Sequence, residues 1–232
     1  MSELVSVGNT LPILVVHIGY GLRSVNAKGG QWMEVNTALK EWASVIAALG
    51  TGRQVILLRK GGIVEAKRGF ELLHPDFLLF PTFEHQHAAS LEPEFHKLAV
   101  PPEGPGISIE YLARVTDIFP TPALITADHI WNDRFLTMRR EYRPDLPLYL
   151  ILVRVYRLAA PSVIPNRPSY AGCKSWVNLT EEIDIAGAAP VLDDESYERR
   201  RDSITTTSMD SGIENHSRRT ISTGRSGETN LP

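Results

Sequence analysis

The stretch from Tyr149 to Leu158 (YLILVRVYRL) constrains the fold of this chain more than any other part of the sequence. Its apolar, β-branched centre predicts a strand that is buried on both faces, and therefore a central strand of a sheet. Because side chains alternate along a strand, Arg154 shares a face with apolar neighbours such as Leu152. We therefore expect Arg154 to be partly buried and to need a carboxylate, a carbonyl group or a ligand as its partner.

The segments around this strand predict the rest of an α+β fold. Apolar residues at helical spacing between Leu39 and Leu49 predict a helix that is capped by Asn36 or Thr37 and ended by glycine. Together the elements favour a small curved, mostly antiparallel sheet or a partial β-barrel with flanking helices. We expect the other strands at residues 54–58, 77–80, 111–119 and 175–179, a second helix at 130–140, and a short closing element at 190–197.

The composition excludes several classes of protein. The chain has 232 residues, 43% hydrophobic and 22% charged residues, and a formal net charge of -3, which is typical of a globular protein and disfavours a generally cationic nucleic-acid binder. Its single cysteine, Cys173, excludes an intramolecular disulfide framework and fits a reducing compartment. The apolar run at residues 11–18 is too short to span a bilayer and lacks the flanks of a secretion signal, so we expect a cytoplasmic protein without a membrane partner.

The chain divides into three segments of different character. Residues 1–36 form an N-terminal extension that we expect to be poorly ordered, or not native to the protein, and residues 37–198 a single globular domain. Residues 199–232 contain no aromatic residue and many serines and threonines, which predicts a disordered tail. Within the tail, RRDS at 200–203 and SRRTIS at 217–222 are candidate targets of basophilic kinases.

The densest polar motif is PTFEHQH at residues 81–87, directly after a predicted buried strand. Glu84 and His85 could form a general acid/base pair, with Thr82 and Gln86 as ligand-binding neighbours. Alternatively, these polar side chains only stabilise a turn. We predict no metal site, because His85 and His87 would point to opposite faces of an extended segment and no HExxH spacing is present. Whether the protein binds a cofactor does not follow from the sequence.

Two further motifs could bind anions. In LLRKGGI at 57–63, Arg59 and Lys60 end a strand, and the backbone N–H groups of Gly61 and Gly62 could cradle a phosphate. The alternative is a hairpin turn with solvated charges. No Walker, GxGxxG or Nudix motif accompanies it.

In GCKSW at 172–176, Lys174 and Ser175 could bind a phosphate, and Trp176 could stack on a base. We interpret Cys173 as a buried structural thiol rather than a nucleophile, because no base is identified beside it.

The HIWNDRF motif at 129–135 supplies a second aromatic candidate. Trp131 could be a stacking platform, with His129 as a ligand-binding neighbour. A tryptophan in the core is the competing interpretation.

Six motifs, taken in order, resemble the bacterial family known as domain of unknown function 1802 over about residues 37–198. They are ALKEW (38–42), LLRKGGI (57–63), FLLFPTFEHQ (77–86), HIWNDRF (129–135), PLYLILVRVYRL (147–158) and GCKSWVNL (172–179). The resemblance implies no activity. The order of elements also resembles ASCH and other PUA-like barrels, which often bind RNA or modified bases.

Three functions follow from these patterns. The first is a binding module for nucleic acid or a nucleotide, acting through Arg59, Lys60, Lys174 and Trp176. The second is a hydrolase or nuclease-like enzyme in which Glu84, His85 and Arg154 converge in one cleft. The third is an interaction protein whose tail is regulated by phosphorylation. The sequence does not predict the oligomeric state.

Overall fold

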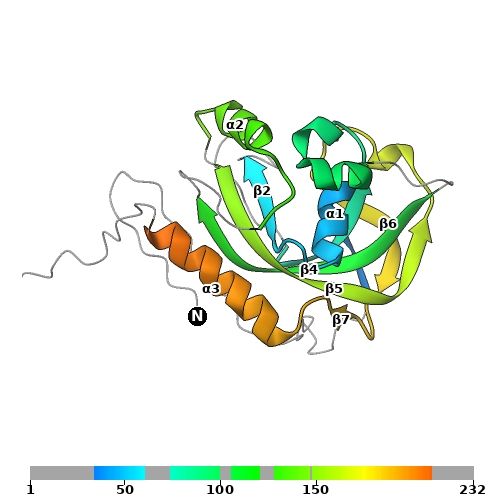
Figure 1. Cartoon of the computed structure of the whole chain (residues 1–232). Coiled ribbons are helices and arrows are strands. Elements are labelled where there is room, and N and C mark those ends of the chain that lie inside the picture. Colours follow the sequence, from blue (N-terminus) through cyan, green and yellow to red (C-terminus); the bar gives the residue numbers. More distant parts are fainter. Residues whose placement is uncertain (1–33, 61–73, 100–105, 121–127, 147, 211–232) are drawn as a thin grey trace, which may run out of the picture.

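The computed structural model describes residues 34–60, 74–99, 106–120, 128–146 and 148–210 (Figure 1). Residues 1–33 and 211–232 of the expected extension and tail lie outside this part, and so do Gly61 and Gly62. No helix in the described part is long and apolar enough to cross a bilayer. The strands are β1 (Glu34–Trp42), β2 (Ile56–Lys60), β3 (Asp76–Thr82), β4 (Ile107–Pro120), β5 (Leu148–Ile164), β6 (Trp176–Asp184) and β7 (Ala189–Pro190). The helices are α1 (Ala43–Gly50), α2 (Asp133–Glu141) and α3 (Asp194–Asp210), with short 3-10 turns η1 (Ala88–Ser90), η2 (Pro93–Ala99) and η3 (Pro168–Tyr170).

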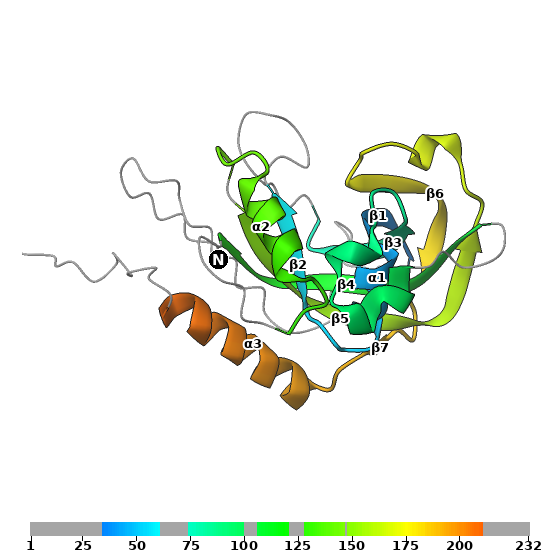
Figure 2. The ribbon, with the colours of Figure 1, turned by 45° about the horizontal axis from the view of Figure 1, so that its top comes forward.

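The strands form one open, mixed sheet in the order β2-β5-β4-β3-β1-β6, with β7 paired to β5. Only β1 and β3 are parallel among the described pairs, and the other neighbours are antiparallel. The long strands β4 and β5 curve strongly, so the sheet wraps around α1 (Figures 1 and 2). The predicted α+β class, with a curved and mostly antiparallel sheet, is confirmed, and β5 is an interior strand as its apolar centre indicates.

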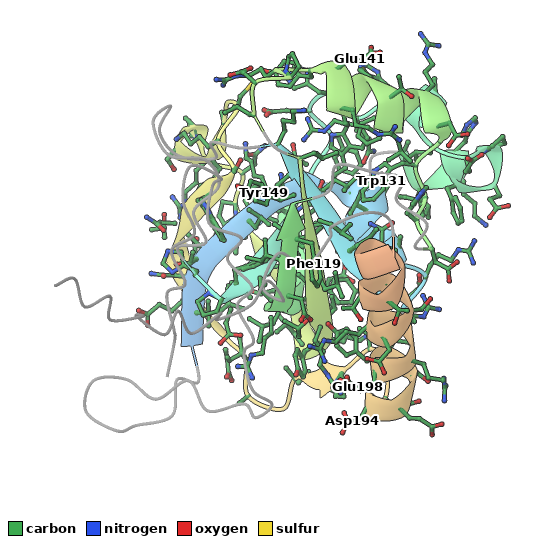
Figure 3. The ribbon with its side chains drawn as sticks, turned by 90° about the vertical axis from the view of Figure 1, so that its left-hand side faces the viewer. Phe119, Trp131, Glu141, Tyr149, Asp194 and Glu198 are labelled. Atoms are coloured by element: carbon green, nitrogen blue, oxygen red, sulfur yellow. The ribbon has the colours of Figure 1, made fainter. Side chains whose placement is uncertain are left out.

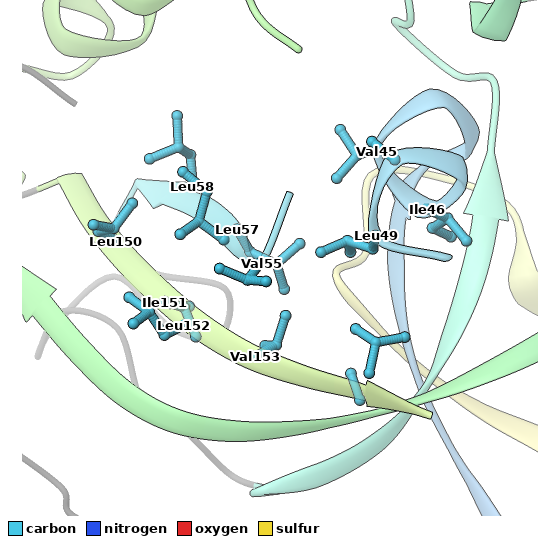
Figure 4. Packing of buried hydrophobic residues seen from close by; sticks show 14 of the residues in the cluster. Val45, Ile46, Leu49, Val55, Leu57, Leu58, Leu150, Ile151, Leu152 and Val153 are labelled. Atoms are coloured by element: carbon cyan, nitrogen blue, oxygen red, sulfur yellow. The ribbon is translucent and has the colours of Figure 1, made fainter. Parts of the chain in front are cut away.

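The main core fills the concave side of this sheet. Val45 and Leu49 of α1 pack with Val55 and Leu57 of the β2 region and with Val153 of β5 (Figure 4). All five side chains are at most 5% exposed. Removing this apolar surface from water is the main stabilising contribution to the fold.

The expected helix from Asn36 or Thr37 is wrong in its first half. Residues 34–42 form β1, and α1 begins only at Ala43. Leu39 belongs to the core around α1, whereas Ala38 packs in a second cluster, as expected of alternate strand positions. The segment is a strand although its apolar residues have helical spacing, because it pairs with β3 on one side and with β6 on the other. Residues 34–36 therefore belong to the sheet.

The C-terminal boundary expected at residue 198 is also displaced, because α3 continues to Asp210. Arg201 donates to Asp117 of β4, with Nε–Oδ2 and Nη2–Oδ1 distances of 2.6 and 2.8 Å. Ile204 is buried in the main core, and Tyr197 Oη lies 2.6 Å from Thr116 Oγ1. Residues 199–210 are therefore helical and not disordered, and the contacts that dock this part of α3 include the ion pair of Arg201 and the buried side chain of Ile204.

The partner expected for Arg154 is also found on α3. Arg154 is buried, donates to the carboxylate of Asp194, and lies against the rings of Tyr156 and Tyr197. The predicted burial and acidic partner are confirmed.

Candidate functional site

A cleft of about 570 Å³ opens beside the ends of β1, β2 and β3. Its volume is in the range of small-molecule sites in proteins. Motifs far apart in the sequence line it together: the ends of β1 and β2, the turn after β3, one side of α2, and the loop before β6. The lining residues are Lys40, Glu41, Trp42, Leu58, Arg59, Lys60, Thr82, Glu84, His85, His87, Trp131, Phe135, Met138, Arg139, Tyr142, Arg143, Gly172, Cys173, Lys174 and Ser175.

The topology explains why these motifs meet. Parallel pairing of β1 with β3 puts Trp42 opposite Thr82, so both strands end at the same edge of the sheet. Lys40 then connects the two sides of the cleft. Its backbone oxygen accepts a hydrogen bond from Arg59 Nη2 at 2.8 Å, and its Nζ donates to the Gly172 oxygen at 3.0 Å.

Positive charge exceeds negative charge in the cleft, although the whole chain carries a net charge of -3. Two carboxylates line the described wall, and each is paired: Glu41 with Arg59 at 2.7 Å, and Glu84 with Lys40 at 3.6 Å. Six cationic side chains share that wall: Lys40, Arg59, Lys60, Arg139, Arg143 and Lys174. The cleft is therefore locally positive and suited to an anion.

The surplus charge is concentrated where β2 meets α2. Burial lowers the pKa of Arg139, and the neighbouring charge of Arg59 lowers it further. Burial and the charge of Arg139 likewise lower the pKa of Lys60. Within the described residues no carboxylate lies within 4.0 Å of either group, and Lys60 Nζ instead donates to the Arg140 oxygen at 2.7 Å. These cations repel one another, and a bound anion would relieve this repulsion.

An exposed apolar surface borders these cations. Tyr142 is 59% exposed and Met138 52% exposed, and both line the cleft at the C-terminal end of α2. Trp131 is buried and stacks at 6.0 Å on Phe135, so it forms a wall and not a free platform. Among the Trp, Phe and Tyr side chains of the described lining, Tyr142 is the exposed one, and an exposed ring is suited to contact a ligand.

The PTFEHQH turn is held by its own polar groups and also contributes to the cleft. Gln86 Oε1 accepts hydrogen bonds from the backbone N and the Oγ of Ser44, at 2.9 and 3.0 Å, and so caps the start of α1. The backbone N of Glu84 donates to Thr82 Oγ1 at 3.2 Å. His85 has a φ of 60°, a left-handed conformation that is uncommon outside glycine. The turn interpretation and the site interpretation thus describe the same residues.

Cys173 differs from the expected buried thiol. It is exposed, and its Sγ lies 3.7 Å from Nε2 of His85 across the rim of the cleft. The two residues are 88 positions apart in the chain, so no local pattern could pair them. The expected burial of this thiol is therefore wrong.

Four predicted site residues do not line the cleft. His129 lies beside Trp131, Gln86 contacts Ser44, and Trp176 packs edge-on against Phe77 at 5.2 Å. Arg154 is bound to Asp194 at the start of α3, at the end of the molecule remote from α2, as Figure 3 shows by the labels of Asp194 and Glu141. The convergence of Glu84, His85 and Arg154 is therefore wrong. The cleft does contain Arg59, Lys60, Thr82, Glu84, His85, Trp131, Lys174 and Ser175, as predicted.

Sequence reasoning missed Lys40, Arg139 and Tyr142. The basic end of α2 was visible in the sequence, where the expected helix ends in basic residues that suit its dipole. Tyr142 follows this basic helix end, and this neighbourhood was a signal for a site that binds an anion and an aromatic ring. No signal indicated that Lys40, in a segment expected to be helical, would be buried beside Gly172.

Comparison with known families agrees with this arrangement of motifs. The family described as "Domain of unknown function (DUF1802)" matches residues 38–203, which is most of the chain. The chain belongs to the DUF1802 family. The matched region of this DUF1802 protein includes β1 from Ala38 onward and α3 as far as Ser203, in agreement with their packing in the core. No curated protein and no solved structure matches the chain.

Proposed function

We propose that the cleft binds a nucleotide unit, either free or within a nucleic acid. One observation carries the proposal: Arg59, Lys60 and Arg139 gather beside the exposed ring of Tyr142 in a nucleotide-sized cleft of a net acidic chain. A nucleotide combines a phosphate, which cations bind, with a base, which an aromatic face binds.

The structure changes the residues assigned to this function. Lys174 Nζ donates to the Ser169 oxygen at 2.7 Å and stays on the rim, whereas Arg139 faces the other cations of the cleft. Tyr142 replaces Trp176 as the stacking residue, because Trp176 packs against Phe77 and His74.

The test is calorimetric titration with nucleoside mono- and triphosphates and a single-stranded oligonucleotide, with inorganic phosphate and an unphosphorylated nucleoside as references. Arg139→Gln should weaken binding about 10- to 100-fold, the effect of losing a hydrogen bond between charged groups. Arg134→Gln is the matched control, because Arg134 is an exposed arginine of α2 outside the cleft lining, and it should change affinity less than about twofold.

Affinity should also fall as salt rises, because an anion held by several cations is screened and counterions are released on binding. Tyr142→Ala should weaken the nucleotide more than inorganic phosphate. If no phosphate-bearing compound binds at low salt, or if Arg139→Gln and Arg134→Gln behave alike, the proposal is refuted.

A further inference from the structure

The rim of the cleft carries a thiol and an imidazole from two separate loops. Cys173 Sγ and His85 Nε2 are 3.7 Å apart, within the reach of a hydrogen bond to sulfur. A cysteine nucleophile needs a neighbouring base to take its proton, and an imidazole is the usual one. The pair is accessible, since both residues are exposed and both line the cleft.

Both loops are fixed to the rigid part of the molecule. Lys40 holds the cysteine loop from β1: its backbone N donates to the Ser175 oxygen at 2.8 Å, and its Nζ to the Gly172 oxygen. The histidine turn is fixed by the side chain of Gln86, which binds Ser44 at the start of α1. These hydrogen bonds hold the thiol and the imidazole close to each other, as two groups that react together require.

We propose that Cys173 is a nucleophile and His85 its general base, and that the cleft hydrolyses an ester or thioester of a phosphate-bearing acyl compound. The proposal rests on the proposed function in one respect: Lys60 and Arg139 hold the phosphate while the acyl carbonyl reaches Cys173. A thiolate attacks carbonyl carbon readily, which favours acyl transfer over the nuclease-like reaction that the sequence suggested.

The reaction proceeds in two balanced steps. In the first, Nε2 of His85 takes the thiol proton as Sγ of Cys173 bonds to the carbonyl carbon, and the leaving oxygen or sulfur departs with that proton. In the second, His85 takes a proton from water, whose oxygen bonds to the acyl carbon. The bond between Sγ and carbon breaks, the proton returns to Sγ, and a carboxylic acid is released. No oxidant or reductant is involved.

Two alkylating agents test the pair separately from the cations. Iodoacetamide is neutral, so its reaction rate with Cys173 reports the thiol and its base. His85→Ala should lower this rate about tenfold, whereas His87→Ala should leave it unchanged, because no contact with Cys173 is found for this second histidine of the turn among the described residues. Equal rates in the His85→Ala and His87→Ala variants would overturn the pair.

The ratio of iodoacetate to iodoacetamide rates reports the cations, because only iodoacetate is anionic. Arg139→Gln should lower this ratio, because it weakens the attraction for the anionic reagent alone. If His85→Ala lowers the iodoacetamide rate but Arg139→Gln does not change the ratio, the result counts against the proposed function alone. If Arg139→Gln lowers the ratio but His85→Ala does not change the iodoacetamide rate, the result counts against the nucleophile alone.

Acyl transfer is tested with two thioesters that share one reactive bond. Acetyl-coenzyme A carries phosphates and a base, and S-acetyl-N-acetylcysteamine carries neither. We expect acetyl-coenzyme A to acetylate Cys173, as mass spectrometry of the intact protein would show, and to release its thiol faster than the neutral thioester does. Cys173→Ser should retain the fold and nucleotide binding but abolish thiol release, and His85→Ala should slow release about 100-fold. Absence of acetylation from both thioesters would overturn the hydrolase and leave only a reactive thiol.

Discussion

The contact between Arg201 and Asp117 permits a sharp test of whether α3 belongs to the domain. Asp117 is 2% exposed on β4, and Arg201 reaches it with a side chain that is 13% exposed. Replacing Arg201 with alanine removes the ion pair of a buried carboxylate, a change that costs about 3–5 kcal/mol in other proteins. Because the end of a surface helix can lift and admit water, we expect the lower end, about 3 kcal/mol.

The matched control is Arg199→Ala on the same helix. Arg199 pairs with Glu195, and the two side chains are 62% and 84% exposed, so this pair contributes roughly 0.3–0.5 kcal/mol. Both substitutions change helix propensity equally, so the difference between them isolates the buried contact.

The assay is urea denaturation followed by circular dichroism. With a slope of about 2 kcal/mol/M, the loss in Arg201→Ala shifts the midpoint by about 1.5 M, whereas Arg199→Ala shifts it by about 0.2 M. Adding Asp117→Asn to Arg201→Ala removes the buried negative charge and should restore part of the stability. Equal midpoints for Arg201→Ala and Arg199→Ala would refute the docking of α3.

Two further predictions concern a buried lysine and a buried tyrosine. Lys40→Met should lower the free energy of unfolding by about 1–3 kcal/mol and raise hydrogen exchange at the loop of Gly172, because the carbonyl there loses its donor; Lys174→Met, on the rim, should do neither. Burial raises the pKa of Tyr111 above its ordinary value of 10.0, against the opposing charge of Arg157, so its contribution to stability is complete below pH 10.0 and is lost as the pH rises through the folded-state pKa. Urea titrations on both sides of this pH should show a smaller alkaline loss in Tyr111→Phe, and an equal loss would contradict the assignment.

Patterns confined to one element were sufficient to predict most of the sheet. The alternation in residues 149–158 predicted the interior strand β5 and the burial of Arg154 with an acidic partner. The identity of that partner, Asp194, depends on how α3 packs, 40 residues later in the chain. Local spacing also led to a wrong prediction at Leu39 and Trp42, which were expected to lie in a helix. Two apolar residues that are three positions apart occur in helices and also at irregular strand ends, and only the pairing with β3 decides between the two.

Patterns confined to one element predict the site less well than they predict the sheet. Arg59, Lys60, Glu84 and Lys174 are polar residues at strand ends, and that local position was sufficient to predict them as candidates. The contact of Cys173 with His85 depends on two loops that meet only in the folded chain. Whether Trp176 offers its ring to a ligand or to Phe77 depends on which side of β6 faces the core, and that requires the register of the whole sheet.

The position of Arg201 also affects how the protein folds during synthesis. Asp117 leaves the ribosome 84 residues before the arginine that neutralises it. Until then, this carboxylate of β4 lacks the ion pair that Arg201 gives it in the folded domain. The contact between β4 and α3 therefore forms only after α3 has been made, and it belongs to a late stage of folding during synthesis.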